Sequence, residues 1–525
     1  MNNNSSQDKV IRLLEEQLAF TKEQNKQLTT QIEALTAQVH QLTKMMYGSR
    51  SEKSKYQAPD GQCSLFEDDP SFNEPEQTGE QSEDTVTYSV TRAKKKKKRN
   101  DVFAEGTEVE EIHHHPSLLT CACCQSDLHE IGAIVAREEA KLIPAKIVCV
   151  RHIEHAYECK QCKKDPEKNA SISRGKAPVA VIPRSIASPE LLARIITDKY
   201  TRYLPLYRQV EEFKRLGLET NDKNLSNWVI RAAEDWLAPI YRAMKVILLL
   251  RSNLHVDETG AQVLHRSDGK SAQSNAYNWV FRSVISEGPI IVLFEHSLTR
   301  SRDVLKAFLA GFEGTIVCDG YSAYADLEKV TFANCWAHVR RYWLKVGTVQ
   351  GAIGVAYCNQ LYRLERKWKG LPPKRRQKKR WREAKKLVRK FFSWLEKSNF
   401  SGKSALTTAA NYTLNLKAGL MTFLRNGHID IDNNAAENAI RPTVVGRKNW
   451  LFSVSEAGAK ANAICLSLAE TAKANGIDFY QYLVKLFTDL PNLPIHQQPT
   501  LLQDYLPWSA NIQATCATIN VTKAA

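Results

Sequence analysis

Between residues 253 and 336, five short apolar runs are separated by polar or Gly- and Pro-containing segments. This spacing constrains the fold more than any other feature of the chain. The runs lie in L-H-V-D-E-T, Y-N-W-V-F-R-S-V, P-I-I-V-L-F-E-H, G-T-I-V-C-D-G and T-F-A-N-C-W. Such runs, rich in β-branched and aromatic residues, are typical of buried strands. A helix over residues 302–312 is expected between the third and fourth runs, so the pattern predicts a sheet crossed by one helix.

Acidic residues end two of these runs, Asp257 the first and Asp319 the fourth. A third acid, Glu437, lies in D-I-D-N-N-A-A-E-N-A-I-R-P, where a short polar helix is predicted to end at Pro442. The order of strands and helix is that of a ribonuclease-H-like fold, in which the first and fourth strands are neighbours. Taken singly, an aspartate at a strand end is more often a cap or turn residue. Together, the three acids can converge on divalent metal ions, and such a site cuts or joins phosphodiesters.

The chain has 525 residues and a net charge of +16 that is unevenly distributed. Its length suggests about three or four domains. Residues 363–390 hold fifteen Lys or Arg against two Glu, which favours a polyanion partner, nucleic acid first, over a solvated helix face. The apolar runs are too short for a membrane span, and the polar N-terminus does not resemble a signal peptide. A cytoplasmic protein is expected, whose twelve cysteines are reduced thiols or metal ligands.

Residues 8–47 carry an unbroken heptad repeat, which predicts a coiled coil. β-Branched residues at several a positions, Leu at most d positions and a single Asn25 at a favour a parallel dimer of fixed register. The alternative is an amphipathic helix that packs on its own protein. Residues 48–112 have few apolar residues and blocks of like charge, so a disordered linker is expected. The lysine run at 92–99 is weak evidence for a nucleic-acid contact or a nuclear address.

Residues 113–170 contain two C-x-x-C pairs, formed by Cys121 with Cys124 and by Cys159 with Cys162. In a reducing compartment, two such pairs predict a four-cysteine structural zinc site in a zinc ribbon. Free thiols, or a fourth ligand drawn from Cys123 or residues 113–115, are the alternatives. The alternation in residues 145–158 predicts a β-hairpin between the pairs.

Residues 186–250 are predicted to be helical, beginning with a helix that Ser188 caps and Pro189 starts. Two further helices, over residues 206–216 and 223–236, flank a turn that contains Gly217. This outline is that of a helix-turn-helix, although a plain helical bundle has the same pattern. In a helix-turn-helix, the start of the last helix faces the bases of a major groove. The candidate DNA-binding residues there are Lys223, Asn224 and Asn227.

Four stretches, H-V-D-E-T, D-G-Y-S-A-Y, C-W-A-H-V-R-R and D-N-N-A-A-E-N-A-I-R-P-T-V-V-G-R-K-N-W-L-F-S, resemble those of the insertion sequence 66 family of bacterial DDE transposases. The resemblance extends over nearly the whole chain. It implies a multidomain α+β protein with a ribonuclease-H-like catalytic core over residues 251–450. A helical insertion over 346–425 and a C-terminal helical segment over 451–525 are expected. It also implies that Asp257, Asp319 and Glu437 bind two magnesium or manganese ions.

Further residues of the same stretches are assigned supporting or DNA-binding roles. Cys335 and His338 form C-x-x-H after the fifth strand, and related transposases carry a similar signature near the site. A second zinc site or an ordinary strand-helix junction are the alternatives for this pair. Around Glu437, the candidate DNA-binding residues are Asn433, Asn434, Arg441, Arg447 and Lys448. Asp432 or Asn433 is expected to cap the helix. Arg441 could pair with Glu437 or contact a phosphate. The alternative for Arg447 and Lys448 is that they are solvated surface charges.

The expected function is DNA transposition. The chain would bind the terminal inverted repeats of an insertion sequence, nick DNA at the element ends and join the freed 3′-hydroxyl to target DNA. A homodimer or higher oligomer through the coiled coil, and accessory proteins of the same element, are the expected partners. A structure-selective nuclease on the same fold and a transposase-derived DNA-binding regulator are the alternatives.

Overall fold

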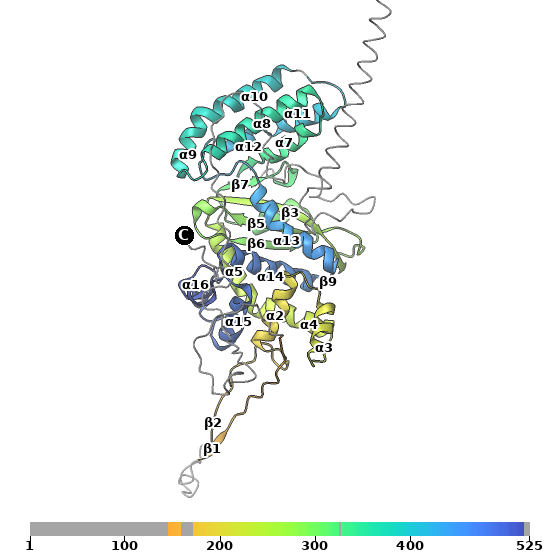
Figure 1. Ribbon diagram of the computed structural model, residues 1–525, viewed down its shortest axis with the longest axis vertical. Coiled ribbons are helices and arrows are strands. Elements are labelled where there is room, and N and C mark those ends of the chain that lie inside the picture. The colour runs from red at the N-terminus through yellow and green to blue at the C-terminus, as the bar shows by residue number, and fades with distance from the viewer. Residues whose placement is uncertain (1–144, 159–171, 325–326, 399, 519–525) are drawn as a thin grey trace, which may run out of the picture. The chain divides into compact units, whose positions relative to one another are not determined.

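A five-stranded mixed sheet forms the centre of the computed structural model, which describes residues 145–158, 172–324, 327–398 and 400–518 (Figure 1). From edge to edge its strands are β6 (Val292–Ser297), β5 (Ala276–Ser283), β3 (Asn253–Ala261), β7 (Thr315–Cys318) and β8 (Thr331–Asn334). β5 runs antiparallel to both of its neighbours, whereas β3, β7 and β8 run parallel. The five expected strands are therefore present. The predicted adjacency of the first and fourth is confirmed by the pairing of β3 with β7.

Apolar residues cover both faces of the sheet, which explains the continuous apolar runs in the sequence. In β5, for example, three successive residues from Trp279 to Phe281 are completely buried. Phe281 stacks on Phe308 of α6 (Arg302–Phe308), with ring centroids 3.6 Å apart. α6 is shorter than the predicted helix 302–312, because Gly311 adopts a positive φ of 84° that a helix does not allow.

α14 (Glu456–Ala474) packs along β6, and α13 (Asn434–Trp450) crosses β3 and β5 (Figure 1). Because β6 is an edge strand, its outward amides have no strand partner. The hydroxyls of Ser467 and Thr471 accept hydrogen bonds from the N–H groups of Phe294 and Val292, at 2.7 and 3.0 Å. α14 thus covers an edge that could otherwise pair with another chain. A small second sheet joins β4 (Val263–His265) to β9 (Ser453–Ser455).

Within residues 172–252 of the described chain, four α-helices precede the sheet: α2 (Pro189–Tyr200), α3 (Leu206–Arg215), α4 (Asp222–Ala232) and α5 (Ala238–Leu249). A π-helical turn, Ala233–Leu237, joins α4 to α5. The capping prediction is confirmed, since the hydroxyl of Ser188 accepts from the N–H of Leu191 at 3.2 Å and Pro189 is the first helical residue. α3 ends before Gly217, which has a φ of 89°.

These N-terminal helices share one hydrophobic core with the sheet and with the C-terminal segment. α15 (Phe479–Asp489) packs on α2, and α16 (Ala510–Cys516) packs on α15. Ile196 of α2, Val256 of β3 and Leu483 of α15 are all completely buried in this core. Segments distant in sequence therefore stabilise the sheet jointly.

A second hydrophobic core lies in the helices between β8 and α13. They are α7 (Trp336–Leu344), α8 (Val349–Lys367), α9 (Pro373–Lys379), a π-helical turn (Arg380–Ala384), α10 (Lys385–Lys397), α11 (Ala405–Asn415) and α12 (Lys417–Thr422) (Figure 1). Trp336, Trp343 and Phe391 are buried at the centre of this core. Val317 of β7 and Ala333 of β8 belong to the same core, so the helices pack directly onto that side of the sheet.

The predicted coiled coil at 8–47, the linker at 48–112 and the cysteines 121, 124, 159 and 162 lie outside the described residues. The hairpin predicted within residues 145–158 is wrong. Only β1 (Ala156–Glu158) is a strand there, and it pairs with β2 (Ile172–Arg174), beyond the second cysteine pair. The segment contains no Gly, Pro, Asn or Asp that would form a tight turn. Among the described residues, no helix is both long and apolar enough to cross a membrane.

Candidate active site

Asp257 and Asp319 lie at the same level of the sheet. In the parallel pairing of β3 with β7, His255 lies opposite Val317. The same register, continued by two residues, brings Asp257 opposite Asp319, which directly follows β7. One expectation is corrected: Asp257 does not end its strand, because pairing with β5 extends β3 to Ala261. The two carboxylates nevertheless lie at the carboxyl end of the β3–β7 ladder.

Glu437 lies in the first turn of α13 and is only 4% exposed. A negative charge in this turn interacts favourably with the helix dipole. The prediction that Pro442 ends the helix is wrong, since α13 continues to Trp450 with Pro442 inside it. Proline cannot donate to the carbonyl of Asn438, but Asn438 is exposed, so water can satisfy this carbonyl.

The three acids share one electrostatic environment. Burial raises the pKa of Asp257 well above its ordinary value, and the charges of Glu258, Glu437 and Asp319 raise it further. Burial also raises the pKa of Asp319, although a backbone N–H and two arginines oppose the shift. Buried like charges of this kind are costly unless protons or cations neutralise them.

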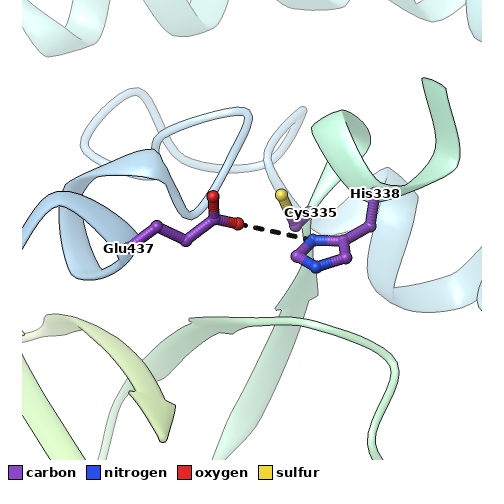
Figure 2. A group of neighbouring side chains, drawn as sticks. All are labelled: Cys335, His338 and Glu437. Carbon is purple, nitrogen blue, oxygen red and sulfur yellow. Dashed lines mark ion pairs between the residues drawn. The ribbon is translucent and has the colours of Figure 1, made fainter. Parts of the chain in front are cut away.

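Side chains of C-W-A-H-V-R-R surround Glu437 (Figure 2). One N–H₂ group of Arg341 donates to both oxygens of Glu437, at 3.1 and 2.8 Å. The Nδ1 of His338 lies 3.7 Å from Glu437 Oε1, and candidate ligand atoms of Cys335, His338 and Glu437 all lie within 4.8 Å of one another. Burial raises the pKa of the Cys335 thiol, whose sulfur accepts from the N–H of Asn433 at 3.2 Å. The C-x-x-H pair thus lies beside the third acid.

Asn433 connects the start of α13 to β3. It is completely buried; its side-chain N–H donates to the carbonyl of Val256 at 2.9 Å, and its Oδ1 accepts from Nδ1 of His255 at 3.0 Å. The other ring nitrogen of His255 lies 3.0 Å from Asp430. The burial of Asn433 corrects the prediction that this residue contacts DNA, because both ends of its side chain form hydrogen bonds inside the protein. Asn433 instead fixes the helix that carries Glu437 to the strand that carries Asp257.

A further acid, Glu258, directly follows Asp257 in β3. It was not singled out from the sequence. Its side chain, 3% exposed, forms an ion pair with Arg300 and accepts from the hydroxyl of Tyr324 at 2.7 Å. The guanidinium of Arg300 also stacks on the ring of Tyr321, 3.6 Å from its centroid. These contacts fasten D-G-Y-S-A-Y, the segment that begins with Asp319, to β3. The adjacent acids in H-V-D-E-T were the available signal.

The predicted DNA-binding residues of α4 are on the surface. Lys223, Asn224 and Asn227 are exposed on the first turns of the helix, whereas Leu225 and Trp228 are buried. The polar face of α4 is therefore accessible to a ligand, as reading of a groove requires.

The candidates on α13 differ in their surroundings. Arg441 and Lys448 are exposed, and Asn434 is half-buried at the start of the helix. Arg447 is half-buried and donates to the carbonyl of Gly260 at the end of β3. Burial lowers the pKa of Arg447. Arg447 thus contacts the protein itself, in addition to any contact it makes with DNA.

Comparison with known families covers most of the chain. Residues 184–461, which include all three acids, match the description "Transposase IS66 family". The chain belongs to the IS66 family of transposases. Residues 119–163, which include cysteines 121, 124, 159 and 162, match "zinc-finger binding domain of transposase IS66". Residues 34–112 match "Transposase C of IS166 homeodomain", and residues 467–508 match "IS66 C-terminal element".

This transposase is also similar to uncharacterized proteins of Sinorhizobium fredii. It is 26% identical to uncharacterized protein y4hP over 514 residues, which cover 93% of this chain and 90% of the relative. It is 29% identical to uncharacterized protein y4jD over 503 residues, which cover 92% and 96% of the two chains. The similarity therefore extends over nearly the whole length of each chain.

Proposed function

We propose that this transposase cuts and joins DNA at a DDE site formed by Asp257, Asp319 and Glu437 on a ribonuclease-H-like core. The observation that carries the proposal is the register of β3 with β7, which brings the two aspartates together beside the helix of Glu437. The sheet order, with its second strand antiparallel and its first beside its fourth, supports the fold assignment.

The donor set fits magnesium or manganese. It consists of carboxylate oxygens, the ligands that hard divalent cations prefer, and its buried negative charge raises the pKa of Asp257. Two such ions, when bound, would activate the attacking oxygen and stabilise the leaving oxygen. Arg341 orients Glu437 through both of its oxygens, each of which keeps a second lone pair for a metal.

The remaining regions would bring DNA to this site. The zinc-finger region, holding zinc with cysteines 121, 124, 159 and 162, and the exposed face of α4 would recognise the terminal inverted repeats. Exposed Arg441 and Lys448 on α13 would hold the DNA backbone near the acids. The coiled coil would bring two protomers to two element ends.

The proposal is tested with the full chain, DNA carrying an element end and a labelled target duplex. Asp319→Asn and Glu437→Gln are expected to abolish nicking and strand joining while DNA binding persists, because the acids act on the reaction rather than on affinity. Asp303→Asn, which changes an exposed acid on α6, is the matched control and should leave both reactions intact.

Two outcomes contradict the proposal. Nicking that survives in both variants would remove the acids from the chemistry. Nicking by the wild-type protein without any strand joining would assign the chain to nucleases, since a nuclease cuts and stops.

A further inference from the structure

Trp381 is the single exposed tryptophan among the ten in this chain, all of which lie in the described residues. Its side chain is 54% exposed, and it lies on the π-helical turn Arg380–Ala384 between α9 and α10. π-Helical turns within helices occur frequently at functional sites. An exposed indole at such a turn is a candidate contact for a ligand.

The turn that presents Trp381 is held firmly from inside. The neighbouring Arg380 is completely buried and donates to both carboxylate oxygens of Glu365, at 2.8 and 2.7 Å. It also donates to the carbonyls of Phe423, Asn426 and Ile429, at 3.0, 2.9 and 2.8 Å. Five hydrogen bonds thus fix the backbone, so the indole is presented in a defined position.

Trp381 forms one wall of an open surface cleft of about 560 Å³. The other lining residues are Gln377, Lys378, Arg382 and Arg425. The ammonium group of a further cation, Lys385, lies 3.1 Å from the centroid of the indole ring. None of the described residues that line the cleft is acidic. The cleft therefore combines an aromatic face with concentrated positive charge.

We propose that this cleft binds an unpaired nucleotide of DNA, with the base stacked on the face of the Trp381 indole opposite Lys385 and the phosphates held by Lys378, Arg382 and Arg425. Stacking on an aromatic side chain inside a basic groove is how proteins bind single-stranded nucleic acid without reading its sequence. A base inside a duplex has both faces covered by its neighbours, so only an unpaired base can reach the indole. The inference rests on the proposed DNA-cutting function and names a second site for the same substrate.

Hydrogen bonds connect the cleft to β3, the strand that carries Asp257. Arg380 binds the carbonyl of Ile429, and the next residue, Asp430, binds His255 of β3. Arg376 of α9 also donates to the carbonyl of Gly427 at 2.6 Å. A nucleotide stacked on Trp381 would therefore be held in fixed relation to the sheet that carries Asp257. This suits a displaced nucleotide of the DNA end being cut.

The test compares a blunt DNA duplex with the same duplex carrying a short single-stranded tail that contains 2-aminopurine. Using the full chain, Trp381→Ala is expected to weaken binding of the tailed duplex by about 5- to 100-fold, the usual contribution of one stacked base. Binding of the blunt duplex should not change. The fluorescence of 2-aminopurine, quenched by stacking in the wild-type complex, should recover in the variant.

Two variants separate stacking from charge and from folding. Trp381→Phe keeps an aromatic face and should retain most of the preference for the tail. Lys378→Ala should weaken binding of both duplexes alike and lower the salt dependence, as loss of a phosphate contact does. Equal affinity of Trp381→Ala and wild type for the tailed duplex would overturn the proposal. Stronger binding of an RNA tail than of the DNA tail would overturn the assignment to DNA.

The result of this DNA-binding experiment does not depend on whether the protein cuts DNA. Asp257→Asn should bind the tailed duplex as the wild type does, even though it would not cut. A wild-type protein that prefers the tail but does not nick DNA would reject the proposed catalytic function alone. A protein that nicks and joins DNA without any preference for the tail would reject the cleft alone.

Discussion

Replacement of Asn433 by alanine should disable the site without touching any of its three acids. The side chain donates to the carbonyl of Val256 and accepts from His255, and it is completely buried. Its removal leaves two buried polar groups without their partner, each costing about 1–3 kcal/mol. We therefore expect Asn433→Ala to lower the free energy of unfolding by about 2–6 kcal/mol. Glu437, one turn further along α13, loses its fixed position relative to Asp257.

Activity should fall more than folding explains. A displacement of about 1 Å at a reacting group can cost about 10²-fold in rate. The nicking rate is measured at saturating DNA and metal, at a temperature where calorimetry shows the variant folded. Asn449→Ala, at an exposed position of the same helix, is the matched control and should behave as the wild type.

A double-mutant cycle identifies the contact responsible. His255→Ala and Asn433→Ala should be non-additive, with a coupling of about 0.5–3 kcal/mol, because each removes the same hydrogen bond. Strict additivity, or an Asn433→Ala protein that is as stable and as active as the wild type, would refute the reasoning.

Three further predictions concern charge and metal. The pKa of Asp257 is raised in the folded state, so ionisation opposes folding above the ordinary carboxyl pKa. The metal-free Asp257→Asn protein should therefore melt at a higher temperature than the wild type at pH 7, with the difference vanishing toward pH ~4; a lower melting temperature at pH 7 would contradict this. Arg380→Met should lower the free energy of unfolding of the helical insertion by about 3–5 kcal/mol, measured by hydrogen exchange, because it leaves the carboxylate of Glu365 unpaired. Unchanged exchange rates there would be inconsistent with the role of Arg380 as anchor. Metal analysis should find about one zinc per chain, and none once Cys159 and Cys162 are both replaced by serine; a zinc content that survives the double change would place the metal elsewhere.

Local patterns predicted the elements of this protein well. The five strands were predicted because their residues are apolar on both faces, and Ser188 with Pro189 marked the start of α2. Failures occurred where the outcome depends on a distant partner. β3 extends past Asp257 because β5 pairs with it. α13 continues past Pro442 because Asn438, whose carbonyl receives no N–H from the proline, is exposed to water.

The contacts around the acids were predicted less completely. Arg341 of α7, which donates to both carboxylate oxygens of Glu437, was not singled out from the sequence. Asn433 was interpreted as a DNA contact, whereas it is buried against β3. In both cases the sequence around α13 was a poor guide, because the relevant neighbours belong to other elements.

By itself, the sequence determined the family of the chain and the order of the elements. Apolar runs specify strands locally, and the motifs around Asp257, Asp319 and Glu437 placed the chain in a transposase family, which the match over residues 184–461 bears out. Only the tertiary structure decided how these parts join. It gave the register that sets Asp257 opposite Asp319, the buried Asn433 that connects α13 to β3, and the exposed Trp381 above a buried Arg380. The physical reason is that strand propensity and helix periodicity act over a few residues, whereas register, burial and ion pairing are settled by groups that are distant in the chain.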